Sequence, residues 1–172
     1  MKNENGKAAR NAPEGGTDAA CRVREGGTDK DGGVRYVAVY GTLMRGERNE
    51  RWREGVETAG TGYVYGRLYD TGWGFPELRP DRSGDMVAVE VLRTDAAGVA
   101  RMDVLEGYPD LYGRERVTVV GANGEARWDA EVYVMRDERR PDGERRIRPR
   151  KVEGWAVEAA DWREYRRSGG GR

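Results

Sequence analysis

The feature that most constrains the fold is that only one segment carries both a start and a stop signal for an α-helix. Thr94 is a good N-cap, and Asp95 suits the positive end of a helix dipole. Gly107 favours the left-handed conformation that ends helices, and Pro109 prevents continuation. These signals predict a helix over residues 95–106, so most of the other regular structure must be β-strand.

Short runs of β-branched and aromatic residues, separated by Gly, Pro and Asn, indicate where those strands lie. The expected strands are residues 34–40, 62–70, 85–93, 112–120 and 127–135, with a further one near 151–157. The expected loops, rich in Gly, Pro or charge, are residues 71–76 and 137–150. Asn123-Gly124 is typical of a tight hairpin turn, and the alternation within 85–93 predicts a strand with one core face.

The remaining patterned segments are short helices. One is expected within residues 49–58, and another begins at Asp161, with Trp162 and Tyr165 packed inward. Together with the strands, they predict one small soluble α+β domain whose patterned core covers residues 34–165.

Both ends of the chain differ in composition from the patterned residues between them. Residues 1–33 carry almost no large apolar side chains and are expected to form a disordered N-terminal tail. The domain is assigned to residues 34–167, and residues 168–172 are expected to be a flexible C-terminus. Cys21, the one cysteine, falls in the N-terminal tail, where nothing nearby would activate it.

The composition excludes several kinds of site. The chain has no histidine and one cysteine, which removes imidazole bases, Cys-His pairs and the usual zinc ligands. Lys+Arg and Asp+Glu are both 31, so no nucleic-acid surface is expected. No apolar stretch approaches the roughly 20 residues of a membrane span, and an apolar signal core is missing as well. We therefore expect a cytoplasmic protein that binds neither nucleic acid nor membrane.

One carboxylate stands out on the predicted helix. Val99, Met102 and Glu106 occupy one face, so Glu106 should point inward with its apolar neighbours. Burial and the negative end of the helix dipole would both raise the pKa of Glu106 toward neutrality, as a general acid or base requires. The alternative is a glutamate that reaches solvent or pairs with Arg114.

A second candidate segment follows the first predicted strand. Tyr40, Gly41, Thr42 and Leu43 form a loop whose exposed backbone N–H groups would suit a carboxylate or a developing oxyanion. The loop lacks the glycine spacing of a phosphate-binding loop. A plain turn between a strand and a loop is the alternative.

Several motifs, taken in their order along the chain, resemble those of the γ-glutamyl cyclotransferase-like family, and in particular its γ-glutamylamine cyclotransferase type. The residues that carry the resemblance are Tyr40-Gly41-Thr42-Leu43-Met44-Arg45-Gly46, Gly66-Arg67-Leu68-Tyr69-Asp70, Phe75-Pro76, Met102-Asp103-Val104-Leu105-Glu106-Gly107-Tyr108, Tyr112-x-Arg114 and Asp161-Trp162-Arg163-x-Tyr165. Met102 stands where the family usually has leucine, and Leu105 where an aromatic residue often precedes the catalytic glutamate.

The resemblance implies a small mixed β-barrel flanked by short helices. It implies a cyclotransferase that releases 5-oxoproline and a free amine from a γ-glutamyl amide, because the substrate's own α-amine attacks the γ-carbonyl. Carried over by position, Glu106 is the acid-base group. Tyr40, Gly41, Thr42 and Leu43 bind the γ-glutamyl head, and Tyr112 and Tyr133 are candidates for pocket walls, with core packing as their alternative. No metal or cofactor is implied.

Two other functions remain open at this stage. One is a non-catalytic domain of the same fold that binds a small molecule. The other is an amidohydrolase that uses water and a carboxylate as its acid-base group. The products distinguish hydrolysis from cyclisation, since water would give glutamate instead of 5-oxoproline. The leaving amine is also open: an amino acid, a lysine side chain or a biosynthetic amine. Residues 73–82 and 137–150 are expected to shape that side of the pocket.

Overall fold

The computed structural model describes residues 33–171. The strands in chain order are β1 (Arg35–Val39), β2 (Glu57–Asp70), β3 (Pro76–Pro80), β4 (Asp85–Thr94), β5 (Tyr112–Gly121), β6 (Arg127–Met135), β7 (Arg145–Ile147), β8 (Arg150–Lys151) and β9 (Glu158–Ala159). The helices are α1 (Ala96–Glu106) and α2 (Trp162–Arg167), with short 3-10 turns η1 (Glu50–Arg53) and η2 (Asp137–Arg139). The predicted N-terminal tail and Cys21 lie outside the described residues.

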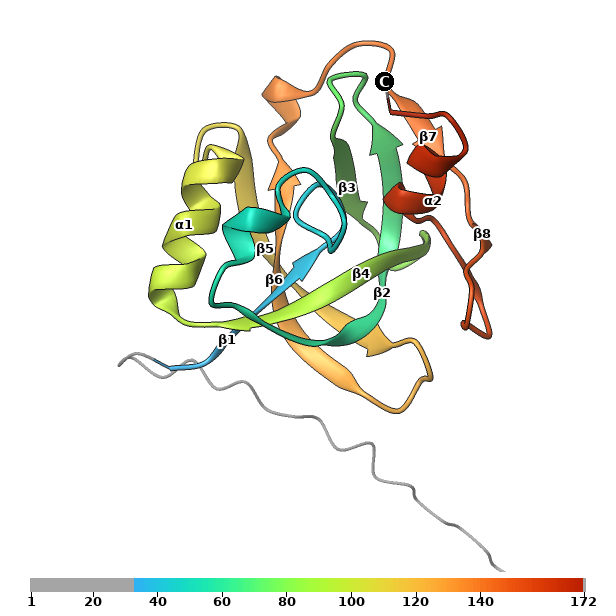
Figure 1. Ribbon diagram of the computed structural model, residues 1–172. Helices are drawn as coiled ribbons and strands as arrows, with labels where there is room; N and C mark the ends of the chain where they lie inside the picture. The colour runs from blue at the N-terminus through green and yellow to red at the C-terminus, as the bar shows by residue number, and fades with distance from the viewer. Residues whose placement is uncertain (1–32, 172) are drawn as a thin grey trace, which may run out of the picture.

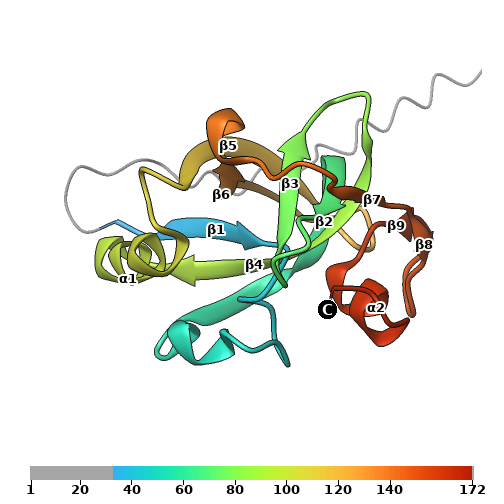
Figure 2. The same cartoon turned by 90° about the horizontal axis from the view of Figure 1, so that it is seen from above.

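A mixed β-barrel forms the centre of the fold, flanked by α1 and α2 on opposite sides (Figures 1 and 2). The strand order is β2-β4-β1-β6-β5, and β5 pairs back with β2 to close the barrel. Only the β1–β6 pairing among these is parallel. Closure depends on Gly62, because a Cβ there would lie 2.2 Å from the carbonyl oxygen of Val120. The expected α+β barrel with flanking helices is confirmed.

Strands β1 and β4 of the barrel are buried on both faces. Ala38 and Val89 belong to the apolar cluster inside the barrel, whereas Val37 and Leu92 belong to a second cluster beneath α1. The expectation of one core face for residues 85–93 is therefore wrong: helix α1 and the segment before α2 cover what would otherwise be the solvent side of β4.

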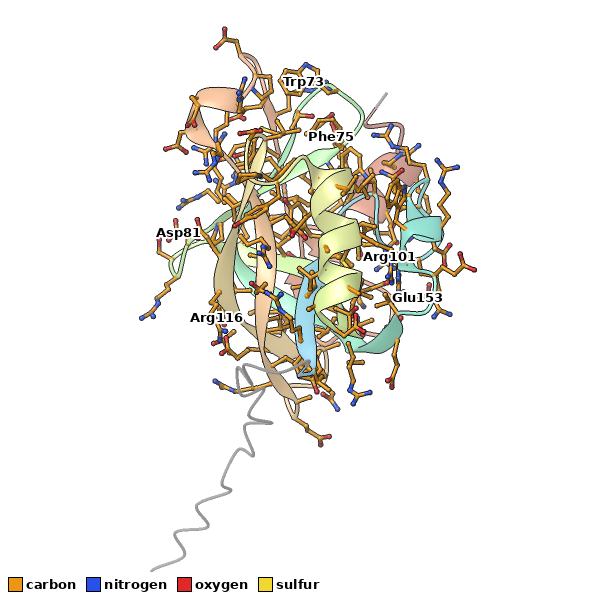
Figure 3. All side chains as sticks on the ribbon, turned by 90° about the vertical axis from the view of Figure 1, so that its left-hand side faces the viewer. Trp73, Phe75, Asp81, Arg101, Arg116 and Glu153 are labelled. Atoms are coloured by element: carbon orange, nitrogen blue, oxygen red, sulfur yellow. The ribbon has the colours of Figure 1, made fainter. Side chains whose placement is uncertain are left out.

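Helix α1 ends where the sequence predicts and begins one residue later. Gly107 adopts the left-handed conformation, with φ of 61°. The N-cap is Asp95, and Thr94 was the wrong choice: the Asp95 carboxylate accepts a hydrogen bond from the Gly98 amide at 2.8 Å, while Thr94 still pairs with Arg35 as the last residue of β4. The helix C-terminus, which carries Glu106, lies beside Phe75 (Figure 3).

The other differences come from long-range strand pairing. The helix expected within residues 49–58 is only the η1 turn, because the chain from Glu57 onward already pairs with β4. The segment after the predicted loop 71–76 forms β3, an edge strand that tolerates proline at both ends. Residues 137–150 include β7, which pairs with the far end of β2. The strand expected near 151–157 is instead a turn between β8 and β9.

The end of the described chain continues from α2. The N–H of Gly169 donates to the Arg166 carbonyl and that of Gly170 to the Tyr165 carbonyl, at 3.0 and 3.1 Å. Trp162 is buried and Tyr165 is partly buried against the barrel core, as predicted. Within residues 33–171, no helix combines the length and apolar character needed to cross a membrane.

Candidate active site

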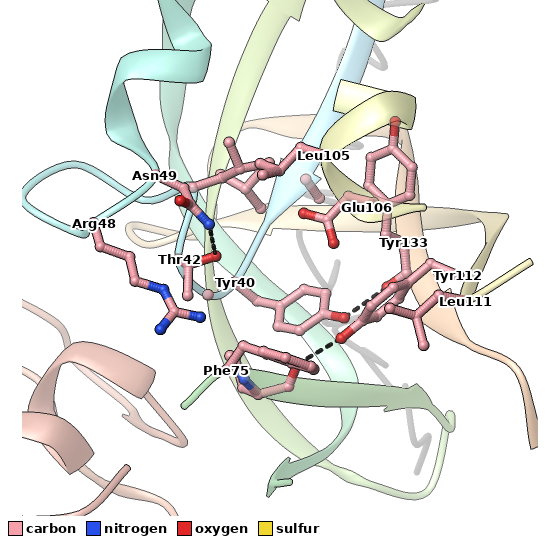
Figure 4. A pocket seen from close by; sticks show the side chains of 15 residues that line it. Tyr40, Thr42, Arg48, Asn49, Phe75, Leu105, Glu106, Leu111, Tyr112 and Tyr133 are labelled. Carbon is pink, nitrogen blue, oxygen red and sulfur yellow. Dashed lines mark hydrogen bonds between the residues drawn. The ribbon is translucent and has the colours of Figure 1, made fainter. Parts of the chain in front are cut away.

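A cavity of about 260 Å³ lies between the C-terminus of α1, the loop after β1 and the start of β3. All the sequence-predicted site residues line it: Tyr40, Gly41, Thr42, Leu43, Glu106, Tyr112 and Tyr133. The remaining lining residues are Ala38, Val39, Arg48, Asn49, Phe75, Pro76, Leu105 and Leu111. The lining is largely apolar and aromatic, and Glu106 and Arg48 are its charged members (Figure 4).

The inward position of Glu106 follows from the face of α1 that packs on the barrel. Val99 and Met102 are almost fully buried on that face, and Glu106 follows one turn later. Its carboxylate points into the cavity between Tyr40 and Tyr133 (Figure 4). The alternative pair with Arg114 does not form, because Arg114 lies against Asp103 and Glu131 at 3.5 and 3.2 Å.

The surroundings of Glu106 favour its protonated form. No group within residues 33–171 forms an ion pair or a hydrogen bond with its carboxylate, and burial raises its pKa from 4.5 to about 7. Glu106 is also the last residue of α1, at the end where the helix dipole is negative. Glu106 can therefore accept or release a proton near neutral pH, which is the property that acid-base catalysis requires.

The raised pKa predicts a pH-dependent effect of Glu106→Gln on stability. In the wild type, the folded-state pKa lies above the unfolded one, so stability from the protonated carboxyl is complete below about pH 4 and is lost as the pH rises to about 7. Glutamine has no carboxyl to ionise, so the variant does not lose this stability as the pH rises. We expect Glu106→Gln to be more stable than wild type at pH 8, by at most about 3 kcal/mol.

Chemical denaturation at pH 4 and pH 8 measures this difference. The expected gain from Glu106→Gln at pH 8 should shrink toward zero at pH 4. The matched control is Glu115→Gln, which replaces an exposed carboxylate on β5. A stability difference that is the same at both pH values would mean that the pKa of Glu106 is not raised by the fold.

The loop after β1 uses its carbonyl groups, but not its first three amide N–H groups, in hydrogen bonds within residues 33–171. The carbonyls of Gly41, Thr42 and Leu43 accept hydrogen bonds from the Met44 amide, the Asn49 amide and the Arg53 guanidinium, at 2.9, 3.0 and 3.4 Å. The amide N–H groups of Gly41, Thr42 and Leu43 have no acceptor within the described part of the chain. Consecutive free amides beside a cavity form a site for a carboxylate or an oxyanion.

Gly41 allows the close contact that completes this side of the cavity. A Cβ on Gly41 would lie 2.7 and 2.9 Å from the Cγ and Cδ atoms of Pro76. Asn49 fixes the next residue, because its side-chain amide donates to the Thr42 hydroxyl at 3.0 Å (Figure 4). The start of β3 therefore packs directly onto the loop.

Tyr40, Tyr112 and Tyr133 form one wall of the cavity, and their hydroxyl groups do not release protons near neutral pH. The Tyr40 hydroxyl donates to the Tyr133 carbonyl at 2.7 Å, and the Tyr112 hydroxyl donates to the Pro76 carbonyl at 3.2 Å (Figure 4). The Tyr133 hydroxyl donates to Asp103 at 2.7 Å. Burial raises the pKa of each phenol well above 10, and the Glu106 charge adds to the shift. All three therefore remain protonated at neutral pH.

Sequence reasoning did not single out individual residues on the far side of the cavity. Phe75 and Pro76 appear in the motifs but carry no signal of a role, since aromatic and proline residues are common in loops. Arg48 and Asn49 precede the η1 turn and have no diagnostic spacing from Glu106. Of the segments expected to shape the amine side, residues 73–82 contribute Phe75 and Pro76, whereas none of residues 137–150 lines the cavity.

Comparisons of the sequence with known proteins identify a matching family and two relatives. The sequence profile of the family described as gamma-glutamyl cyclotransferase, AIG2-like, matches residues 37–164. A candidate gamma-glutamylcyclotransferase of Drosophila melanogaster is 36% identical over 95 residues, which cover 49% of this chain and 59% of the relative. A second, from Halalkalibacterium halodurans, is 43% identical over 49 residues, which cover 28% of this chain and 44% of the relative. Both matches span less than two thirds of the relative.

Solved structures share the fold at lower identity. A protein specific to uropathogenic Escherichia coli superposes with a TM-score of 0.56 and 22% identity, covering 77% of this chain and 95% of the other.

Proposed function

The chain belongs to the gamma-glutamyl cyclotransferase, AIG2-like family, and we propose that it converts a γ-glutamyl amide into 5-oxoproline and a free amine. The α-amino nitrogen of the substrate attacks its own γ-carbonyl carbon, a new C–N bond closes the five-membered ring, and the original amide C–N bond breaks. No water is consumed. The observation that carries the proposal is the carboxylate of Glu106, which lies in the cavity with a pKa near 7.

Glu106 has a defined part in this reaction. As a carboxylate it accepts a proton from the substrate's α-ammonium group, which frees the nitrogen lone pair for attack. Glu106 passes this proton to the nitrogen of the leaving amine as the tetrahedral intermediate collapses. The ring nitrogen loses a second proton in the same step; Glu106 accepts it and gives it to the released amine, which departs as an ammonium ion. One carboxylate that changes its protonation state near neutral pH is sufficient for both transfers, and a chain without histidine can supply it.

The free N–H groups of Gly41, Thr42 and Leu43 suit the γ-glutamyl head. They offer hydrogen bonds to an anionic oxygen, and the tyrosine wall restricts the flexible chain of the substrate to a ring-closing conformation. Such restriction removes part of the entropic barrier to cyclisation.

Product analysis tests the proposal and separates it from its two rivals. We expect the protein, incubated with a panel of γ-glutamyl amines, to release 5-oxoproline and the amine in equal amounts. Release of glutamate would instead indicate an amidohydrolase that uses water. Saturable binding of the panel without any product would indicate a non-catalytic binding domain.

Arg48 supports a leaving amine that carries an acidic group. Its exposed side chain lines the cavity, and its Nη1 atom lies 3.2 Å from the position that a Cβ on Gly74 would take, so it reaches across toward the loop before β3. Within residues 33–171 it has no ion-pair or hydrogen-bond partner. Glu106 and Arg48 thus place a proton acceptor and a cation in one cavity (Figure 4).

Removing Arg48 should lower the preference for acidic leaving groups. We expect the wild type to favour a γ-glutamyl amino acid over the corresponding amino-acid amide, and Arg48→Ala to reduce that ratio of kcat/KM by about fivefold to tenfold, the range of a solvent-accessible charge-assisted contact. Arg51→Ala, which removes an exposed arginine of the η1 turn, is the matched control. A ratio that Arg48→Ala leaves unchanged would remove the argument for an acidic leaving group.

A further inference from the structure

Two buried charges lie behind the cavity loop and take no part in lining the cavity. Glu90 on β4 and Arg53 at the end of η1 form an ion pair, with side chains only 4% and 6% exposed. Arg163 of α2 adds a second contact to Glu90, at 2.9 Å. Buried charges are costly unless they are paired and hydrogen-bonded, so their presence here calls for a structural reason.

The pair holds the backbone of the loop on both sides of Met44. The Glu90 carboxylate accepts from the Arg45 amide N–H, at 3.2 and 3.3 Å to its two oxygens. The Arg53 Nη1 atom donates to the Leu43 carbonyl at 3.4 Å, and its Nη2 atom donates to the Thr58 hydroxyl. Met44 itself is fully buried under α1. Glu90 on β4 and Arg53 at the end of η1 thus bind the two peptide groups that flank Met44.

This arrangement holds the end of the segment that carries the free amides. The hydrogen bond from Arg53 fixes the peptide plane between Leu43 and Met44, which directly follows the free amides, and rotating this plane would lose a buried hydrogen bond. The Leu43 N–H lies in the preceding plane, whose Thr42 carbonyl accepts from the Asn49 amide at 3.0 Å, and the Thr42 N–H lies in the plane whose Gly41 carbonyl accepts from the Met44 amide at 2.9 Å. Rotation of the peptide after Met44 would leave the Glu90 carboxylate without its backbone donor.

We propose that Glu90 and Arg53 are positioning residues, which act through the loop to keep the Gly41, Thr42 and Leu43 amides directed at the substrate. Neither side chain touches the cavity, so neither is a catalytic residue. The consequence for catalysis rests on the proposed function, whereas the consequence for the loop backbone does not.

The test replaces Glu90 by glutamine and, in a second variant, Arg53 by lysine. Glutamine removes the charge that holds Arg53 and Arg163. Lysine keeps a charge opposite Glu90, yet a single ammonium group cannot replace the guanidinium fork that reaches Leu43 and Thr58 together. Because Glu90→Gln leaves two arginines without their partner and can impair folding, Arg53→Lys keeps the proposal testable in a folded protein.

Two readouts separate positioning from general stability. We expect KM for a γ-glutamyl amine to rise at least tenfold, while the acid-limb midpoint of kcat/KM stays unchanged because Glu106 is untouched. By amide hydrogen exchange, the Arg45 N–H should exchange at least tenfold faster, whereas those of Val89 and Val91 on β4 should not. Glu131→Gln is the matched control, since Glu131 also lies between two arginines, Arg35 and Arg114.

The outcomes are distinct for the two proposals. A variant with a lower Tm but with wild-type KM and wild-type exchange at Arg45 overturns the positioning role. If the wild type forms no 5-oxoproline from any γ-glutamyl amine, the proposed function fails, and exchange at Arg45 alone decides the role of the pair: faster exchange than at Val89 and Val91 supports it, and unchanged exchange overturns it.

Discussion

Replacing Glu106 by glutamine is expected to lower kcat by about 10²- to 10⁴-fold, the usual contribution of a positioned acid-base group. Glutamine has nearly the same shape as the protonated glutamate, so the cavity and its tyrosine wall should be preserved. It cannot accept a proton from the substrate's α-ammonium group or return one to the leaving amine. Substrate affinity should therefore change little while turnover is almost abolished.

Steady-state kinetics, together with direct binding of the substrate to the Glu106→Gln variant, measure the two effects separately. Glu115→Gln, an exposed change of the same type, should retain wild-type activity. Activity of Glu106→Gln within tenfold of wild type, a loss of no more than about 1.4 kcal/mol, would exclude the assigned role.

Substitution of Gly41 by alanine is expected to have the second largest effect, a loss of about 10²-fold in kcat/KM. The added methyl group would lie 2.7 Å from the Pro76 ring, so either the loop or the start of β3 must move. Movement of the loop displaces the amides of Gly41 and Thr42, and displacements of about 1 Å in a binding site can cost this much activity. Because the proton acceptor itself is untouched, the pH dependence should be preserved.

The matched control for this change is Gly113→Ala on β5. Gly113 follows the cavity residue Tyr112, but a Cβ there meets no atom closer than 3.9 Å. We expect its kcat/KM to stay within about twofold of wild type, an effect below 0.5 kcal/mol. If Gly41→Ala and Gly113→Ala had equal activity, the contact between Gly41 and Pro76 would not matter for the site.

Local signals predicted the parts of the fold that depend on neighbouring residues. The C-terminus of α1 at Gly107 and the hairpin of β5 and β6 follow from conformational preferences of a few residues, and both are confirmed. The N-cap was misplaced by one residue because Thr94 and Asp95 are both good caps, and only the pairing of Thr94 within β4 decides between them.

Long-range pairing accounts for what could not be predicted. Strand β3 begins and ends with proline and forms only because β2 extends beyond the barrel and offers it an edge. For the same reason β7 adds to β2 from a segment that is otherwise highly charged. The burial of Glu90 is also invisible in the alternation of β4, since its partners Arg53 and Arg163 come from distant parts of the chain.

The candidate site was more predictable than the barrel around it. The position of Glu106 after Val99 and Met102 on one helix face predicted an inward carboxylate, with a solvent-exposed glutamate or a pair with Arg114 as the alternative. The carboxylate and the loop from Tyr40 to Leu43 line the same cavity. The presence of Phe75 and Pro76 in the cavity lining depends on how the start of β3 meets that loop. No periodic pattern in the sequence encodes such a contact.

The pH dependence of kcat/KM, compared between wild type and Glu106→Gln, tests the central role of Glu106 most directly. In the wild type we expect kcat/KM to be low in acid and to rise with a midpoint near 7, the pKa to which burial raises this carboxyl. This step should disappear from the residual activity of Glu106→Gln, whereas any step from the substrate's own ammonium group remains. A midpoint below pH 5 in the wild type, or an acid limb that Glu106→Gln leaves unchanged, would show that another group carries the proton.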